Sequence, residues 1–251
     1  MLDKEKRLFY NGAMQEQKMI QAIGYIRCDF KEKFGIPRQS GRASSLRAEI
    51  IFHAPYHCAD AFRGIEEFSH LWLLFDFSKT EDKAFSPTVR PPRLGGNKRV
   101  GVFASRSPYR PNRIGLSCVK LVEVKKAENG SVSLVVSGAD LLDGTPILDI
   151  KPYIPFTDCM IDATGGYASE HEHDRLEVDF PKPLLAQIPL DKQAGLLDCL
   201  ADDPRPSYQN EPTRVYGMKF AEFEIKFRVE NNRLTVVAVE KNFKRLTNGF
   251  F

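Results

Sequence analysis

Between residues 23 and 150 the sequence alternates short apolar runs, rich in β-branched and aromatic residues, with polar loops that contain glycine or proline. This spacing predicts strands at 23–26, 48–52, 68–77, 100–104, 114–124, 131–137 and 147–150. Asn129-Gly130 separates two of these runs, and Asn-Gly is a strong signal for a β-hairpin. Many short strands with few helices favour a β-barrel or a β-sandwich.

Two segments in this part carry more specific predictions. The run at 68–77 is almost continuously apolar, which is typical of a strand buried on both faces. Phe62 and Ile65 stand at helical spacing, so one short helix is predicted at 59–68.

After Tyr153 the pattern changes, and a polar stretch at 164–174 is typical of a linker. A helix ending before Asp203-Pro204 is predicted beyond it. Its expected apolar face consists of Leu190, Ala194, Leu197 and Leu200. Apolar and charged residues alternate over 223–229, and Asn231-Asn232 turns this half-buried strand into another at 234–240.

The domain organisation expected from these patterns is an N-terminal extension at 1–19, a mainly β domain at 20–160 and a small α+β domain at 165–251. The longest apolar stretch, 71–75, is far shorter than the roughly 20 residues of a membrane-spanning helix. The first residues are charged and do not resemble a secretory signal, so a cytoplasmic protein is expected.

The cysteines are scattered and form no CxxC pair, which argues against a disulfide framework and against a zinc ribbon. Buried, reduced thiols are the simpler interpretation. The positions are Cys28, Cys58, Cys118, Cys159 and Cys199.

Positive charge is concentrated in one segment of a chain whose net charge is only +3. Residues 87–113 contain no acid and seven basic residues: Arg90, Arg93, Lys98, Arg99, Arg106, Arg110 and Arg113. Such a local excess suggests an anionic partner that meets one face. A solvated surface loop accounts for the composition equally well, and this alternative stays open.

The segment 102–115 runs from a strand through a loop with two prolines and back into a strand. Proline fixes φ, so the loop holds Arg106, Arg110 and Asn112 with less conformational freedom to lose on binding. Guanidinium groups suit phosphates and carboxylates, and Tyr109 is placed to stack on a base. Upstream, Gly95-Gly96 lies in a basic segment for which a flexible arm that contacts RNA phosphates and a disordered loop are equally good interpretations. No GK[ST] follows, so the segment is not a P-loop.

Other candidate sites have weaker support. Asp143 and Asp149 bracket a turn, and turn capping is favoured over a ligand contact. His70 is expected to pack or to contact a cofactor. His171-Glu172-His173 has no third ligand at sensible spacing, so no metal is expected. A GxGxxG segment after a strand is absent, which excludes a standard Rossmann site.

Several motifs occur in an order that resembles the TsaA-like family. They are Ile23–Ile26, Lys33–Gln39, Phe68–Trp72, Arg90–Gly96, Arg106–Asn112, Asp143–Tyr153 and, in the second domain, Asp203–Tyr208. The resemblance implies a β-barrel methyltransferase domain that binds S-adenosyl-L-methionine, followed by a small α+β C-terminal domain, in a homodimer. The implied reaction methylates N6 of threonylcarbamoyl-adenosine, 3′ of the anticodon in threonine tRNA.

The resemblance also implies cofactor contacts. These fall on Pro37, Arg38, Gln39, Phe77, Ser78, Arg106, Leu116, Asp140, Leu141, Leu142 and Asp143. Because all of them precede Tyr153, the first domain alone is expected to bind the cofactor. The residues expected to bind RNA are Arg90, Arg93, Lys98, Arg99, Tyr109, Arg110 and Asn112.

No general base is identified by the sequence. Asp143 and Arg110 are the candidates for a direct part in the reaction, and proton transfer to bulk water is the alternative for the base. Two rival functions remain: a non-enzymatic RNA-binding or scaffold protein that uses the same basic loop, and a metal-dependent hydrolase that uses His171 and His173.

Overall fold

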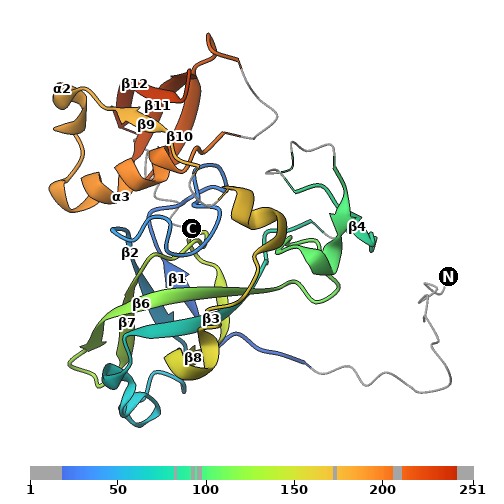
Figure 1. The fold of residues 1–251 in the computed structure, drawn as a ribbon. Coiled ribbons are helices and arrows are strands. Elements are labelled where there is room, and N and C mark those ends of the chain that lie inside the picture. The colour runs from blue at the N-terminus through green and yellow to red at the C-terminus, as the bar shows by residue number, and fades with distance from the viewer. Residues whose placement is uncertain are drawn as a thin grey trace, which may run out of the picture.

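The computed structural model describes residues 19–81, 84–91, 94, 98–171, 174–205 and 211–241. A closed β-barrel lies below a smaller sheet in Figure 1, and the longest helix packs beside that sheet. The barrel strands follow the order β1-β2-β7-β6-β3-β8. Their bounds are β1 Gly24–Arg27, β2 Arg47–Phe52, β3 His70–Asp76, β6 Ile114–Lys126, β7 Val132–Ser137 and β8 Pro146–Pro152. The prediction of a β-barrel followed by a small α+β domain is confirmed.

The barrel interior is built from alternate residues of each strand. On β3, Leu71, Leu73 and Phe75 are buried and face the core. The residues between them are only partly buried, so the prediction that this strand is buried on both faces is wrong. Gly115 on β6 is required by Phe75, because a Cβ there would lie 2.2 Å from the phenyl ring.

The single helix predicted at 59–68 is replaced by two 3₁₀ turns, η1 Ala59–Phe62 and η2 Ile65–Glu67. Gly64 lies between them with φ of 85°, a left-handed conformation that interrupts a right-handed helix. The apolar spacing therefore indicates helical turns at both positions, but the prediction of one continuous helix is wrong.

The strand predicted at 100–104 is also shorter than expected. Only β5 Val100–Gly101 pairs, with β4 Thr88–Val89, and the chain then turns into η4 Val102–Ala104. The amide of Val102 donates to the carbonyl of Pro87 at 2.9 Å, and this bond ends the small hairpin. The loop with two prolines therefore begins from a 3₁₀ turn rather than from a barrel strand.

The segment between the two sheets is partly helical. It contains α1 Pro155–Asp158 and η5 Gly166–His171, whereas a linker was predicted at 164–174. In Figure 1 this segment runs from α1 past the barrel towards the second sheet.

The second sheet has the order β10-β11-β12-β9, with β9 parallel to β12. Its elements are β9 Glu177–Asp179, α2 Lys182–Leu185, α3 Leu190–Ala201, β10 Tyr216–Phe220, β11 Phe223–Glu230 and β12 Arg233–Lys241. The predicted alternation on β11 and the Asn231-Asn232 turn are confirmed, and both asparagines have positive φ. Strands β9 and β10 were not predicted.

Helix α3 was predicted correctly, but its buried face only in part: Leu200 is buried as predicted and Leu197 is partly buried. Leu196, Cys199 and Leu200 are buried, whereas Leu190 is 84% exposed and Ala194 is exposed. The face is rotated because the helix packs on two surfaces, the sheet and the long loop between β1 and β2.

That β1–β2 loop, residues 28–46, belongs to the core of the second domain although its flanking strands belong to the barrel. Phe30, Ala43 and Leu46 are buried in one cluster with residues of α3 and of β10 to β12. A Cβ on Gly195 of α3 would lie 2.3 Å from Leu46, so the helix and the loop are in close contact. The two domains are therefore joined by an apolar core as well as by the chain.

Within the described residues, no helix has the length and the apolar character needed to cross a membrane. The expectation that all cysteines are buried is wrong for Cys58 and Cys159, which are exposed. All five thiols are free. Burial raises the pKa of the Cys28 thiol to about 12, and burial also raises the pKa of Cys199.

These differences predict selective thiol chemistry. Ellman's reagent at pH 8 should modify Cys58 and Cys159 quickly, and Cys28 and Cys199 at least about 100-fold more slowly, because the thiolate is the reactive form. Mass spectrometry of tryptic peptides assigns each site, and denatured protein should react at all five. Rapid modification of Cys28 in the folded protein would contradict the packing described here.

Candidate functional site

A cleft of about 1820 Å³ lies beside the barrel. Its walls come from segments that are distant in sequence: the β1–β2 loop, the β4–β5 hairpin, the loop with two prolines and η5. Binding sites for small ligands commonly have volumes of roughly 300–1,000 Å³, so this cleft has room for a cofactor together with part of a second substrate.

The lining of the cleft is strongly basic. Among the described lining residues Glu81 is the single acid, whereas the bases are Lys33, Arg38, Arg42, Arg90, Arg99, Arg106, Arg110 and Arg113. Large aromatic side chains are also exposed there: Phe85 is 62%, Phe103 is 73% and Tyr109 is 46% exposed. Positive charge beside exposed rings suits a ligand with phosphates and bases.

The cleft brings together two groups of residues that the sequence singled out. From the expected cofactor set it contains Pro37, Arg38, Gln39 and Arg106, and from the expected RNA set Arg90, Arg99, Tyr109 and Arg110. Arg106 Nη1 donates to Gln39 Oε1 at 2.8 Å. The β1–β2 loop and the loop with two prolines therefore meet at this pair.

Other expected residues do not line the cleft. Leu141 is buried in the barrel core, Phe77 packs its ring 5.0 Å from Phe75, and Leu116 is exposed on the outer face of β6. The remaining residues outside the lining are Ser78, Asp140, Leu142, Asp143, Lys98 and Asn112. Arg93, Gly95 and Gly96 lie outside the described residues.

Asp143 ties the barrel to the start of the β1–β2 loop. Its Oδ1 accepts from the amide of Cys28 at 2.9 Å, and its Oδ2 pairs with Lys31 Nζ at 2.6 Å. Both carboxylate oxygens are thus engaged away from the cleft. Both partners belong to the β1–β2 loop and not to the turn of Asp143, so the contact differs from the predicted turn capping, and it gives no support to Asp143 as a general base.

Arg110 turns back onto its own loop. Its Nη1 donates to the carbonyls of Val102 at 3.3 Å and Ser105 at 2.7 Å, and its guanidinium lies 5.8 Å from the centre of the Phe103 ring. These contacts hold the loop and place Phe103 at the rim of the cleft. The sequence alone gave no partner for Arg110 and did not single out Phe103.

Asp140 lies behind the Gln39–Arg106 pair. Its carboxylate accepts from the hydroxyl of Ser117, which is 1% exposed and points into the barrel from β6. Burial raises the pKa of Asp140, and the Ser117 hydroxyl, a backbone hydrogen bond from Ser40 and the charge of Arg106 offset only part of that rise. Ser117 was missed by the sequence interpretation, although a serine at an inward position of an alternating strand is an unusual signal.

His70 does not line this cleft. His70 Nδ1 lies 2.9 Å from Ser69 Oγ, and its ring packs near Tyr153, so the packing role is the one observed. Glu172 and His173 lie outside the described residues, and the described part of the chain contains no group of metal-ligating side chains.

The raised pKa of Asp140 predicts a pH dependence of stability. A folded-state pKa above the unfolded value means that folding disfavours the charged carboxylate, so this penalty is absent at low pH and complete once the pH exceeds the folded pKa. Asp140→Asn removes the charge. The free energy of unfolding of this variant, relative to that of the wild type, should therefore increase as the pH rises from acid to neutral.

Urea unfolding at a series of pH values measures this difference. Asp149→Asn, at a carboxyl whose side chain is 45% exposed on β8, is the control. A difference between Asp140→Asn and the wild type that falls with rising pH would contradict the burial argument.

Comparison with known proteins agrees with this arrangement. Residues 25–159 match the family described as the tRNA-methyltransferase O N-terminal domain, and residues 173–242 match the TrmO C-terminal domain. The chain is 44% identical to the tRNA (adenine(37)-N6)-methyltransferase of Escherichia coli (strain K12), covering 88% of this chain and 97% of that one. It is 42% identical to a putative S-adenosylmethionine-dependent methyltransferase of Pseudomonas aeruginosa, over 82% of this chain and 90% of that one.

The structure is similar to solved ones. A crystal structure of TrmO from Pseudomonas aeruginosa superposes with a TM-score of 0.70 at 33% identity, and covers 90% of this chain and 100% of that one. Another crystal structure of TrmO gives a TM-score of 0.72 at 35% identity, over 89% of this chain and 99% of that one. Both domains and their order are matched, and the chain therefore belongs to the tRNA-methyltransferase O family.

Proposed function

We propose that this chain methylates N6 of adenosine 37 in tRNA with S-adenosyl-L-methionine as the methyl donor. The observation that carries the proposal is the meeting of Gln39 and Arg106 in a basic cleft with exposed aromatic rings. The likeness to tRNA (adenine(37)-N6)-methyltransferases over nearly the whole chain supports the same reaction. The finer proposal is that the accepting base is threonylcarbamoyl-adenosine in threonine tRNA, and that the protein works in the cytoplasm.

The residues of the cleft suit this cofactor chemically. The Arg106 guanidinium offers paired donors to a carboxylate, the Gln39 amide offers a donor and an acceptor, and Pro37 adds apolar surface. When bound, S-adenosyl-L-methionine supplies a methyl group on a positively charged sulfur, which is an effective electrophile.

The basic side chains of the cleft prepare the nucleophile. A ureido nitrogen loses its proton more readily than an amine, and nearby guanidinium groups stabilise the anion that results. Because Asp143 does not line the cleft, we assign the proton to solvent water rather than to that residue. The rest of the acceleration is assigned to alignment of the reacting atoms by the loops that Arg106 and Gln39 join.

RNA recognition is assigned to the wall opposite the β1–β2 loop. Arg90 and Arg99 come from the β4–β5 hairpin, and Tyr109 and Phe103 present exposed rings beside them. Single-stranded loop bases are commonly recognised by stacking on such rings, with phosphates held by arginine. Arg110, because it holds this loop, is assigned to the RNA side and not to the cofactor. A non-enzymatic RNA-binding protein would not require the hydrogen-bonded pair of Gln39 and Arg106.

We also propose a homodimer through the outer face of the barrel. Trp72 and Leu74 on β3 pair in register with Cys118 and Leu116 on β6, which makes one continuous apolar strip. Trp72 Nε1 donates to Asp158 of α1 at 3.0 Å, so this helix lies at the edge of the strip. Exposed apolar side chains extend the strip: Ile114, Leu116, Phe156, Met160 and Ile161. An uncovered apolar surface of this kind is typical of an interface.

Purified protein with S-adenosyl-L-methionine should add one methyl group to adenosine 37 of threonylcarbamoyl-modified threonine tRNA, as read by mass spectrometry of nuclease digests.

Arg106→Ala should weaken cofactor binding about 10- to 150-fold, since it removes a charged hydrogen-bond partner. Arg106→Lys should restore only part of the affinity, because lysine keeps the charge but loses the paired geometry.

Arg110→Ala is the companion variant. It should reduce methylation more than it reduces cofactor affinity in calorimetry, since Arg110 holds the rim of the cleft. Absence of cofactor binding in the wild type, together with unmethylated tRNA, would favour the non-enzymatic binder. Normal cofactor binding by Arg106→Ala would remove that residue from the site.

The dimer should be visible by light scattering at micromolar concentration. Phe156→Glu, at a side chain that is 90% exposed, should shift the protein towards the monomer because it places a charge in the proposed interface. Val237→Glu on β12, at an apolar side chain that is 43% exposed, is the matched control and should leave the dimer intact. A wild type that is monomeric, or an equal effect of both variants, would contradict this interface.

A further inference from the structure

The β1–β2 loop has two sides with different partners. One side, which includes Phe30 and Leu46, is buried in the core of the second domain. The other side carries Pro37, Arg38 and Gln39, which line the cleft of the barrel domain. The position of the cleft residues is therefore fixed by contacts on both sides of the loop.

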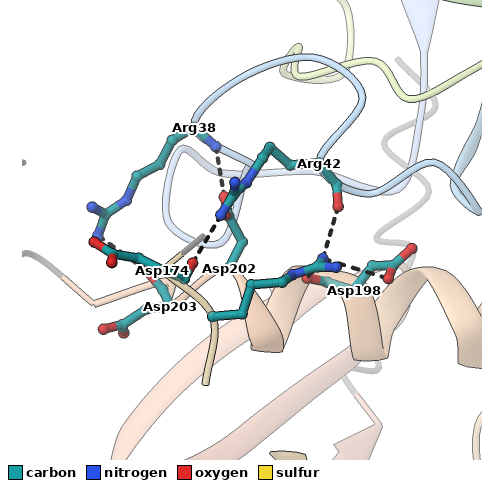
Figure 2. A network of polar contacts seen from close by, with 7 residues as sticks. Arg38, Arg42, Asp174, Asp198, Asp202 and Asp203 are labelled. Atoms are coloured by element: carbon teal, nitrogen blue, oxygen red, sulfur yellow. Dashed lines mark hydrogen bonds and ion pairs between the residues drawn. The ribbon is translucent and has the colours of Figure 1, made fainter. Parts of the chain in front are cut away.

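On the second-domain side, the main polar contact is Asp202, directly after α3. Its side chain is only 2% exposed, and both of its carboxylate oxygens are used. Oδ2 accepts from the backbone amide of Arg38 at 3.1 Å, and Oδ1 accepts from Arg42 Nε at 2.6 Å. One carboxylate thus holds both ends of the segment 38–42, as Figure 2 shows.

Further bonds secure the same segment. Arg38 Nη2 donates to the carbonyls of Asp203 and Arg205 at 3.1 and 2.7 Å, so its side chain points to the second domain. Arg42 Nη2 donates to the Asp174 carbonyl at 2.8 Å, and Arg175 Nη2 donates to the Arg42 carbonyl at 2.9 Å. Arg38, Arg42, Asp174 and Asp203 lie around Asp202 in Figure 2.

On the barrel side, the segment 38–42 contacts residues of the proposed cofactor site. Gln39, the residue next to Arg38, accepts from Arg106 at 2.8 Å. The amide of Gly41 donates to the carbonyl of Gly138 at 2.8 Å. A displacement of Arg38 therefore moves Gln39, because only one peptide bond separates a residue held by Asp202 from a residue held by Arg106.

The location of Asp202 is not explained by the stability of its own helix. A carboxylate at the C-terminal end of a helix faces the negative end of the helix dipole, which is an unfavourable placement. Burial of the charge adds a desolvation cost. Its contacts with Arg38 and Arg42 offset both effects, and those contacts belong to the loop of the cleft.

We propose that Asp202 is a positioning residue for the cofactor site, through which the second domain sets the geometry of Arg38 and Gln39. The proposal rests on the proposed function, in which these loop residues bind S-adenosyl-L-methionine. It replaces the expectation that the first domain binds the cofactor by itself, because the loop that carries Gln39 is anchored outside the first domain.

The test is Asp202→Asn in the full-length chain, which keeps the shape of the side chain but removes its charge. Calorimetry with S-adenosyl-L-methionine should show affinity reduced about 10-fold, and hydrogen exchange of the 38–42 amides should rise by a similar factor. Asp202→Glu, which keeps the charge, should recover part of both. All binding is measured well below the melting temperature of each variant.

The matched control is Lys192→Met. Lys192 Nζ pairs with Asp29 Oδ2 at 2.5 Å and also joins α3 to the β1–β2 loop, but at the start of the loop and away from the cleft. This variant should lower the melting temperature without changing cofactor affinity or the exchange of the 38–42 amides.

The outcomes separate the two proposals. If the wild type does not bind S-adenosyl-L-methionine, the proposed function fails, whereas faster amide exchange at 38–42 in Asp202→Asn alone would still support control of the loop by Asp202. If the wild type binds and Asp202→Asn binds equally well, the positioning role is overturned. It is also overturned if both variants lose affinity in proportion to their loss of melting temperature, since that pattern belongs to a purely structural contact.

Discussion

The burial of Phe30 and Leu46 from the β1–β2 loop in the core of the second domain is the contact on which the cleft depends. It draws the loop out of the barrel and places its middle, Pro37–Gln39, at the boundary between the domains. Without this apolar contact the loop would be held only at its two ends, and the entropy cost of ordering it would oppose any fixed geometry. The hydrophobic packing therefore decides where the polar groups of the site stand.

The polar groups then refine that placement from both sides. Asp202 holds the loop from the second domain, and Arg106 meets it from the loop with two prolines. Arg110 bonds to carbonyls of its own loop, and so keeps that second wall in shape. Both walls of the cleft are fixed before a ligand enters, which lowers the entropy that binding has to overcome.

Local patterns in the sequence predicted most barrel strands, because alternation and Asn-Gly are signals that neighbouring residues carry. The same patterns predicted one helix at 59–68, because apolar spacing does not indicate the left-handed conformation of Gly64. The resemblance supplied Arg38 and Gln39 as site residues, but not the partner Asp202, which is 164 residues away from Arg38. Part of the buried face of α3 was missed for the same reason, since its packing partner Leu46 belongs to a loop of the other domain.

The cleft concentrates basic residues from several segments of the chain. Arginines close together repel one another and do not favour folding, so their concentration needs another cause. Two of them bond to backbone carbonyls: Arg110 to Val102 and Ser105, and Arg38 to Asp203 and Arg205. Such bonds satisfy donors without neutralising the charge, because a carbonyl carries none. The cleft therefore keeps a fixed positive field, which suits a polyanion such as tRNA and requires no rearrangement of the loops to display it.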